Sequence, residues 1–434
     1  MPIVGQARTL EKDAVMKKRM AKNKNGLIAA LDIGTSKIAC FIAKVGDDGT
    51  IRVVGIGHHA SNGVRAGIIS DVEAAENAIL ATVHAAEQMA GENIEHVIVN
   101  LSGGQPKSRL VAYEVAIGGH EIGDGDLRRI LDPVNLGAEK PEEHELLHRI
   151  PMGYGVDGNR GIADPRGMYG EKLSVNMHMV TALRGSLRNL ESVIRRCHLN
   201  IEDVVVSPYA AALGCISDEE KALGVTCIDM GGGTTSVAVF FDGELVHVDV
   251  LPIGGGHVTN DITRGLVTPI NHAERLKTLY GNAIPSTNDD RQLIQIPSVG
   301  EEETPEAHTV PRSVLVGIVR PRIEEIFEQV RDRLKKAGFD QVAGRGLVLT
   351  GGASQLPGVR EVADTVLDKQ ARFGRPLAMD GMAEAAAGPT FAVCAGLLQY
   401  GLGHRAEEIG AKMPQVAESQ GRFGRIGQWL RENF

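Results

Sequence analysis

Ile228-Asp-Met-Gly-Gly-Gly-Thr-Thr235 ends an apolar run with an aspartate, three glycines and two hydroxyl residues. Nearly the same order occurs earlier, as Leu31-Asp-Ile-Gly-Thr-Ser-Lys37, and a third glycine turn, Leu349-Thr-Gly-Gly-Ala-Ser354, also follows an apolar run. Glycines let backbone N–H groups approach phosphate oxygens, and hydroxyl groups add further donors. An aspartate at a strand end can hold hydrated Mg²⁺. The three turns therefore predict a site for a nucleoside triphosphate with its metal ion.

The two aspartate turns lie in matching surroundings. Residues 27–57 predict a strand, the turn, a second strand, an Asp-Gly turn and a third strand, and residues 224–255 predict the same order. Asp-Gly between apolar runs is a strong signal for a β-hairpin. The same three-stranded unit is therefore predicted twice, which indicates two lobes that close on one ligand from opposite sides.

The rest of the chain alternates between helical and strand patterns. Residues 282–311 show neither pattern and are predicted to be irregular. Strands are expected over 96–101, 204–206 and 346–349, and helices over 71–90, 184–200, 208–215, 257–281, 312–337 and 388–401.

These patterns predict two lobes, each built from segments that are separated in the sequence. The predicted division is a disordered basic tail over 1–25; the core of lobe 1 over 26–101, 181–216 and 388–402; an inserted subdomain over 102–180; the core of lobe 2 over 217–256 and 313–387; a small subdomain of lobe 2 over 257–312; a linker over 403–418; and an amphipathic helix over 419–434.

Composition narrows the class of protein. The 434 residues carry a net charge of −9, which argues against general nucleic-acid binding. The basic tail is either a solvated leader or a segment attracted weakly to an anionic surface. No apolar run reaches the length of a membrane span, and no signal-peptide core follows the basic start, so we expect the chain to stay inside the cell. Widely spaced cysteines among apolar neighbours predict buried, reduced thiols, at Cys40, Cys197, Cys215, Cys227 and Cys394.

The order of the motifs resembles the actin, Hsp70 and sugar-kinase superfamily over roughly residues 27–400. This resemblance implies an α/β fold, namely a two-lobed actin-like (ribonuclease H-like) ATPase fold, with ATP and Mg²⁺ bound between the lobes. Ala273-Glu-Arg-Leu-Lys277 resembles the helix that contacts the base and ribose in Hsp70-like members. The metal-side carboxylates are then Asp32 and Asp229. The candidate nucleotide-binding residues are Gly34, Thr35, Ser36, Lys37, Gly231, Gly232, Gly233, Thr234, Thr235, Glu274, Lys277, Gly351, Gly352 and Ser354.

Within that superfamily, the inserted segment resembles the FtsA family of bacterial division proteins, through Arg149-Ile-Pro151 and Asp164-Pro-Arg-Gly-Met168. The resemblance implies a polymer on the cytoplasmic face of the inner membrane at the division site. It also implies other division proteins as partners, and binding of the FtsZ C-terminal tail around residues 257–320. Arg312 and Arg320 are the candidate contacts for that tail; the alternative is that they lie on a solvated helix face.

The C-terminus predicts an amphipathic helix. Its apolar residues fall on one face at helical spacing, with arginines on either side, as in helices that lie in a bilayer interface. The alternative is a helix docked on the chain's own globular body. The apolar residues are Phe423, Ile426, Trp429, Leu430 and Phe434.

The stretch that would carry a water-positioning glutamate in the Hsp70-like and MreB-like relatives has Ser207 before Pro208. A serine is no general base at neutral pH without an activator. At most a weak ATPase is therefore expected, in which ATP regulates assembly. The alternatives are a sugar or acid kinase of the same superfamily, or an assembly ATPase resembling PilM.

His144-Glu-Leu-Leu-His148 matches a zinc-protease pattern that requires a helix. The segment is short and lies between Pro141 and Pro151, so we set this interpretation aside.

Overall fold

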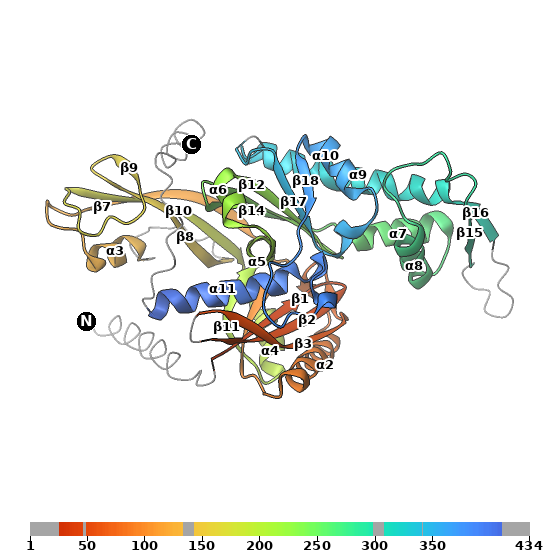
Figure 1. Cartoon of the computed structure of the whole chain (residues 1–434), viewed down its shortest axis with the longest axis horizontal. Helices are drawn as coiled ribbons and strands as arrows, with labels where there is room; N and C mark the ends of the chain where they lie inside the picture. Colours follow the sequence, from red (N-terminus) through yellow and green to blue (C-terminus); the bar gives the residue numbers. More distant parts are fainter. Residues whose placement is uncertain (1–25, 47–48, 133–142, 298–307, 341, 410–434) are drawn as a thin grey trace.

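The computed structural model describes residues 26–46, 49–132, 143–297, 308–340 and 342–409. Two lobes lie against each other, with a small β-rich subdomain at one end of the molecule and helices that end in a short β-hairpin at the other (Figure 1). Among these residues, no helix is long and apolar enough to cross a membrane.

Lobe 1 is built on a five-stranded sheet with helices on both faces. Its strand order is β11-β6-β1-β2-β3. One face packs against α2 and α4 and the other against α5 and α11, and each face has its own apolar core. The elements are β1 (Leu27–Ile33), β2 (Lys37–Val45), β3 (Ile51–Ala60), α2 (Val72–Ala90), β6 (His96–Leu101), α4 (Arg184–Arg196), β11 (Asn200–Val206), α5 (Ser207–Cys215) and α11 (Ala392–Ile409), with the short pair β4 (Val64–Arg65) and β5 (Ile68–Ile69).

Lobe 2 repeats this sheet, with the order β14-β13-β12-β17-β18. Strands β12, β13 and β14 form the same antiparallel meander as β1, β2 and β3, which confirms the predicted repeat. The elements are α6 (Asp218–Leu223), β12 (Val225–Met230), β13 (Thr235–Phe241), β14 (Glu244–Leu251), α7 (Gly255–Leu266), α8 (Ile270–Tyr280), β15 (Leu293–Ile296), β16 (His308–Pro311), α9 (Arg312–Lys336), β17 (Gly346–Thr350), α10 (Val359–Leu367) and β18 (Gln370–Phe373).

Helices α5 and α11 lie side by side between the two sheets. Small residues let their backbones touch: a Cβ added at Gly396 would lie 1.7 Å from the carbonyl oxygen of Ala210, and one at Gly214 would lie 2.0 Å from that of Ala392. The short glycine and alanine side chains of both helices are therefore a packing requirement of the centre of the molecule.

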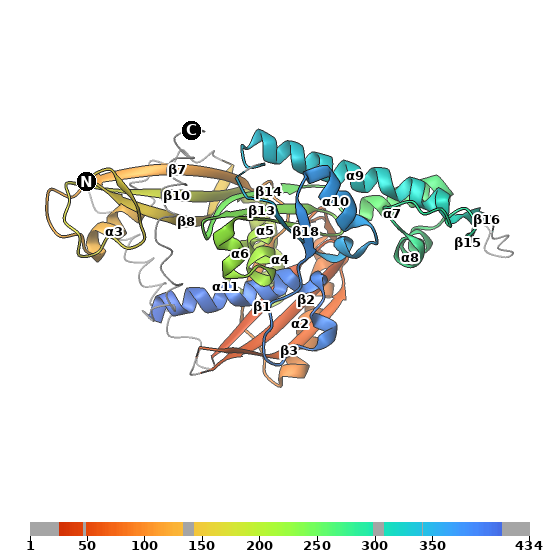
Figure 2. The same ribbon diagram turned by 45° about the horizontal axis from the view of Figure 1, so that its top comes forward.

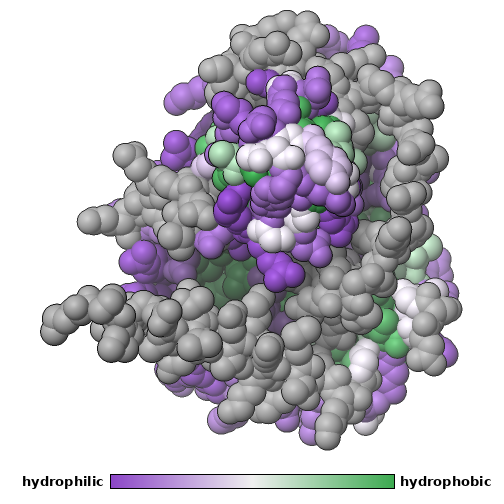
Figure 3. All heavy atoms as spheres, turned by 90° about the vertical axis from the view of Figure 1, so that its left-hand side faces the viewer, coloured by the Kyte–Doolittle hydropathy of each residue, from purple (hydrophilic) through white to green (hydrophobic). Residues whose placement is uncertain are grey.

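The inserted subdomain follows lobe 1 in the sequence and packs beside lobe 2 in space (Figure 2). Helix α3 covers one face of its four-stranded sheet, whereas Leu110 and Met152 join the apolar core of lobe 2. Its outer end presents mainly hydrophilic side chains (Figure 3). The sheet order is β7-β10-β8-β9, from β7 (Lys107–Ala116), α3 (Asp124–Leu131), β8 (His144–Val156), β9 (Asn159–Ile162) and β10 (Lys172–Leu183).

Four expectations need correction. The helix predicted over 257–281 is two helices, because Val267 takes a left-handed conformation and Pro269 follows it. The helix predicted over 184–200 ends at Arg196, and His198 is left-handed before β11 begins. The stretch over 282–311 contains the hairpin β15–β16. The predicted linker over 403–418 is wrong in its first part, because α11 continues to Ile409.

Candidate functional site

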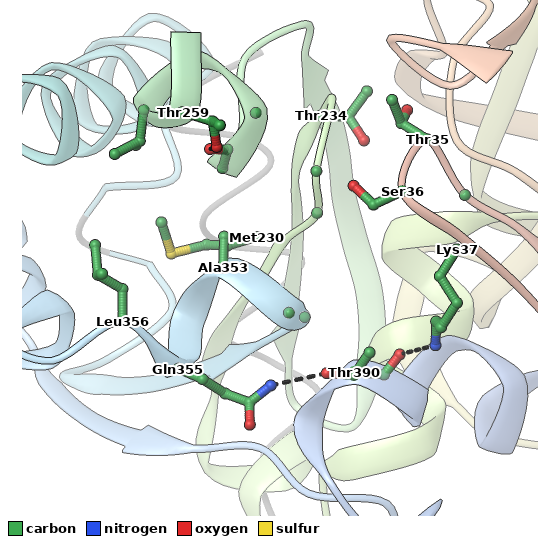
Figure 4. Close-up of a pocket in the computed structure, with 18 of the residues that line it drawn as sticks. Thr35, Ser36, Lys37, Met230, Thr234, Thr259, Ala353, Gln355, Leu356 and Thr390 are labelled. Atoms are coloured by element: carbon green, nitrogen blue, oxygen red, sulfur yellow. Dashed lines mark hydrogen bonds between the residues drawn. The ribbon is translucent and has the colours of Figure 1, made fainter. Parts of the chain in front are cut away.

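A cavity of about 920 Å³ lies between the lobes and is lined by both of them. All three glycine turns reach it: the β1–β2 turn from lobe 1, and the β12–β13 turn and the turn after β17 from lobe 2. Residues of α7, α8 and α9 and of the segment that leads into α11 also line it. Thr35 and Ser36 face Thr234 across the space, with Thr259 and Leu356 farther along it (Figure 4).

The two aspartate turns touch each other. A Cβ added at Gly232 would lie 1.8 Å from Ser36 Oγ, and one at Gly233 would lie 2.5 Å from Thr35 Oγ1. A larger residue at either glycine would therefore have to displace the Ser36 or Thr35 side chain of lobe 1. Hydrogen bonds from the amides of Gly255 and Gly256 to the carbonyls of Gly231 and Gly232 tie the start of α7 to the same turn, at 2.9 and 2.7 Å.

On the lobe 1 side, Asp32 is 7% exposed and accepts a hydrogen bond of 2.7 Å from Asn100 Nδ2. The Lys37 ammonium donates to the carbonyl of Thr390 at 2.6 Å and lies 3.8 Å from the centre of the Phe391 ring. Gln355 donates to the hydroxyl of Thr390 at 2.8 Å, so this threonine joins residues of both lobes (Figure 4).

The charges of the site are unevenly balanced. Burial raises the pKa of Asp32, against the opposing effects of Lys37 and the Asn100 hydrogen bond. Burial, followed by the charge of Asp32, raises the pKa of Asp229 to about 7. Burial lowers the pKa of Lys37. The site therefore holds two carboxylates and one ammonium group. Carboxylate oxygens are the ligands that a hard divalent cation such as Mg²⁺ prefers.

At the far end of the cavity, Glu274 and Lys277 of α8 form the predicted i, i+3 pair, with 2.7 Å between Oε2 and Nζ. Lys277 Nζ also donates to Thr259 Oγ1 at 2.9 Å and to the carbonyl of Gly255 at 3.2 Å. This network links α7 to α8 and presents one acid and one base to the cavity. Apolar groups of Ile270, Ile323 and Leu356 lie nearby in its wall.

The predicted site residues fall into two groups. Those that line the cavity are Asp32, Gly34, Thr35, Ser36, Lys37, Asp229, Gly231, Gly232, Thr234, Glu274, Lys277, Gly351 and Gly352. The residues that do not line it are Gly233, Thr235 and Ser354. The Thr235 hydroxyl donates to the carbonyl of Ile253 at 2.8 Å, and that of Ser354 donates to the carbonyl of Gly351 at 2.7 Å, so both support the turns.

Several residues of the site escaped the sequence analysis. Asn100 is the second-last residue of the strand predicted over 96–101, and Ser102 follows that strand, so their place at a strand end was a usable signal. Thr259, Gln355 and Thr390 carried none, because only the folding of distant segments brings them to the cavity.

The remaining candidates lie elsewhere. Arg312 is largely buried and donates to Asp289 at 2.7 Å and to the carbonyl of Tyr280 at 2.7 Å. Arg320 is about half exposed and pairs with Glu324 at 2.7 Å. The five C-terminal residues predicted to bind membrane lie outside the described part of the chain.

His144 and His148 lie on strand β8, so the helix that the zinc-protease pattern requires does not form. His148 Nε2 accepts a hydrogen bond of 3.1 Å from the amide of Val206. This histidine therefore joins the inserted subdomain to β11 of lobe 1.

Two family models match the chain. The model "Cell division protein FtsA" matches residues 226–396, and the model "SHS2 domain inserted in FTSA" matches residues 103–181. The second match falls on the sheet formed by β7, β10, β8 and β9.

Among known proteins, the cell division protein FtsA of Rhizobium meliloti (strain 1021) is 41% identical over 429 residues, which cover 96% of this chain and 97% of that relative. The PilM–PilN type IV pilus biogenesis complex matches in structure with a TM-score of 0.61 at 18% identity, covering 86% of this chain and 98% of the other. MreB5 of Spiroplasma citri bound to AMPPNP matches with a TM-score of 0.55 at 15% identity, covering 88% and 98%. These structures show the actin-like fold predicted from the order of the motifs.

Proposed function

The chain belongs to the FtsA family of cell division proteins, and on that premise we propose that it binds magnesium–ATP between its lobes and assembles with copies of itself. The assembled protein links the FtsZ tail to the inner membrane at the division septum. Of these functions, nucleotide binding has the most direct support from the geometry of the cavity.

One observation carries the proposal: three glycine turns from two lobes line one cavity of about 920 Å³. The turns offer backbone N–H groups and hydroxyls to phosphate oxygens, and the Glu274–Lys277 pair with its apolar neighbours offers a place for ribose and base. The structural relative MreB5 was solved with AMPPNP, which supports the same use of the fold.

Asp32 and Asp229 would hold the magnesium ion through its water ligands. The ion neutralises phosphate charge when bound. The two carboxylates and Lys37 then serve to position the phosphate end of the nucleotide and to hold the two turns at a fixed distance.

Hydrolysis is expected to be slow, because a serine occupies the position where a water-orienting acid would lie. Ser207 is 2% exposed, and its hydroxyl lies 2.8 Å from Ser102 Oγ and 3.0 Å from Asn100 Nδ2. The hydroxyl is thus held by neutral partners that cannot accept a proton at neutral pH. ATP then acts mainly by keeping the lobes closed in the form that assembles.

The nucleotide proposal is tested by thermal shift and by equilibrium binding of a fluorescent ATP analogue with and without Mg²⁺. We expect saturable binding that Mg²⁺ strengthens, together with turnover far below that of a metabolic kinase. Absence of binding by the full chain would contradict the proposal, whereas rapid phosphate release would contradict only the role given to Ser207.

The membrane proposal is tested by sedimentation with liposomes that contain anionic lipid. We expect the full chain to sediment and a chain that ends at Glu418 to stay in solution. Gln428→Ala, on the polar side of the predicted helix, serves as the matched control and should sediment like the parent chain. Equal recovery of the truncated and full chains would exclude this anchor.

For the FtsZ tail, exposure favours Arg320 over Arg312: both arginines have an acidic partner, but the Arg320 side chain is 46% exposed and that of Arg312 only 18%. Arg320→Ala should weaken binding of a labelled FtsZ tail peptide, measured by anisotropy. Lys336→Ala, an exposed change at the other end of α9, should leave it unchanged. Equal effects of the two variants would exclude a specific contact at Arg320.

A further inference from the structure

Parallel pairing places Asn100 next to Asp32. Strands β1 and β6 pair in parallel, with Leu31 opposite Val99, so the residues that follow in each strand meet at the edge of the cavity. Strand β11 pairs on the other side of β6, with Val205 opposite Asn100, and α5 begins two residues later at Ser207. Asn100 is therefore the middle member of three adjacent strand ends.

The Asn100 side chain is 2% exposed and uses both of its polar atoms. Its Oδ1 accepts a hydrogen bond of 2.6 Å from the amide of Ile33, the last residue of β1 before the first glycine turn. Its Nδ2 lies 2.7 Å from Asp32 Oδ1, 2.9 Å from Ser102 Oγ and 3.0 Å from Ser207 Oγ.

Two amide hydrogens cannot serve three acceptors equally. The contact with Asp32 is the shortest of the three and the only one to a charged group, and hydrogen bonds to charged groups are the stronger kind. The two serine hydroxyls also lie 2.8 Å from each other and can satisfy one another. The carboxylate is therefore the dominant partner of the amide.

We infer that Asn100 is the positioning residue for the metal-side carboxylate of lobe 1. It holds the Asp32 carboxylate in one orientation and, through the Ile33 amide, holds the backbone from which the first phosphate turn departs. This role deepens the proposed nucleotide function and rests on it. Asn100 acts through Asp32, and it does not contact the nucleotide or the metal ion itself.

The chemistry of the position explains why an amide suits it. An apolar side chain of the same size would leave both the Ile33 amide and the carboxylate without this partner in a buried site. A serine or alanine is too short to reach both groups. The amide is neutral and carries a donor and an acceptor on opposite corners, so it joins a strand amide to a carboxylate without adding charge.

The test separates positioning from general stability by measuring the affinity for a fluorescent ATP analogue twice, with Mg²⁺ and with EDTA. In Asn100→Ala we expect the strengthening produced by Mg²⁺ to fall about ten-fold, as for loss of one hydrogen bond to a charged group, while the affinity in EDTA changes less than about two-fold. Thr82→Ala removes another buried hydrogen bond of lobe 1, from its hydroxyl to the carbonyl of Ala78, and should change neither value.

A second readout needs no ligand. Hydrogen exchange of the peptide that contains Ile33 should be faster in Asn100→Ala than in the parent chain and unchanged in Thr82→Ala. Asn100→Ser, which keeps a polar group in the buried site, takes the place of the alanine variant if that variant does not fold. The inference is overturned if the affinity falls equally with Mg²⁺ and with EDTA, or if Mg²⁺ strengthens binding equally in variant and parent.

Failure of the proposed function gives a different result. If the parent chain itself does not bind the analogue, nucleotide binding is wrong and there is no metal for Asn100 to serve. If the parent binds and Mg²⁺ strengthens that binding, while the Asn100 variants behave like it, only the positioning role is wrong.

Discussion

Lobes 1 and 2 contain the same strand–turn–strand unit, but the aspartate of that unit has different hydrogen-bond partners in the two lobes. In lobe 1, Asp32 accepts a hydrogen bond of 2.7 Å from Asn100, at the end of the parallel neighbour strand. In lobe 2 the matching neighbour is Thr350, which pairs with Asp229. Its hydroxyl is directed to the carbonyls of Gly374 and Pro389, at 2.9 and 3.0 Å, and not to the carboxylate.

The side chain of Asp229 has a weaker hydrogen-bond partner. The hydroxyl of Ser236 lies 3.5 Å from its Oδ2, at the limit of a hydrogen bond. The structural repeat therefore supplies two carboxylates to one cavity. The neighbouring side chains hold the Asp32 carboxylate in one orientation and leave that of Asp229 less constrained. Repetition of a backbone unit does not imply repetition of its chemistry.

The largest effect is expected at Gly351. Lobe 2 needs a glycine at this position, whereas the matching position of lobe 1, after Asn100 in β6, is Leu101. Gly351 has φ 83° and ψ 163°, a region essentially restricted to glycine, and a Cβ there would lie 2.3 Å from Asp229 Oδ1. Gly351→Ala should cost about 3 kcal/mol in the free energy of unfolding, measured with urea, and abolish nucleotide binding. Gly388→Ala, where a Cβ meets nothing within 4 Å, is the control. Similar losses in both variants would contradict this account.

The second prediction sets the two carboxylates against each other. Each of Asp32→Asn and Asp229→Asn removes one charged contact. Asp229→Asn should lower the affinity for magnesium–ATP about ten-fold. Asp32→Asn should lower it about 100-fold, because Asp32 is held in place before the ligand binds. Titration with the fluorescent analogue measures both, and the same titration in EDTA shows how much depends on the metal. Equal losses would mean that orientation by Asn100 has no consequence.

The third prediction concerns pH without ligand. Burial, followed by the charge of Asp32, raises the pKa of Asp229 to about 7 in the folded protein, well above the ordinary range of an aspartate, so the folded state binds a proton that the unfolded state has lost. Stability should therefore decrease as the pH rises from about 4 to about 7 and change little through this group above that range. Asp229→Asn should flatten this part of the curve and be relatively more stable than the parent at pH 8.

Melting temperatures across pH 5 to 8 measure this effect. Burial also raises the pKa of Glu244 to about 7, so the difference between the parent and Asp229→Asn isolates the cavity carboxylate. Identical pH profiles for the two proteins would show that Asp229 is ionised throughout.

The smallest effect is expected for Ser236→Ala. At 3.5 Å its hydroxyl contributes little to Asp229, so the free energy of unfolding should change by less than about 0.5 kcal/mol. Urea denaturation measures the change beside that of Asn100→Ala, whose contacts are shorter and more numerous. A loss for Ser236→Ala as large as for Asn100→Ala would remove the distinction between the two lobes.

Much of the fold could be predicted because local patterns and final structure agree. The Asp-Gly turn after β13 and the long helix α9, which continues through Pro321, follow the expected boundaries. The failures occur where a few residues override a longer pattern: left-handed Val267 separates α7 from α8, and α11 remains helical to Ile409. The hairpin β15–β16 was missed because each of its strands has only four residues.

By itself, the sequence determined the repeated strand–turn–strand unit, the three glycine turns and the aspartates that end two strands, because backbone geometry and turn chemistry are written in neighbouring residues. Only the tertiary structure decided what holds each aspartate. Asn100 reaches Asp32 through the parallel pairing of β6 with β1, and Thr350 turns away toward segments 24 and 39 residues distant. Such partners depend on strand order and on packing between distant segments, which no local pattern encodes.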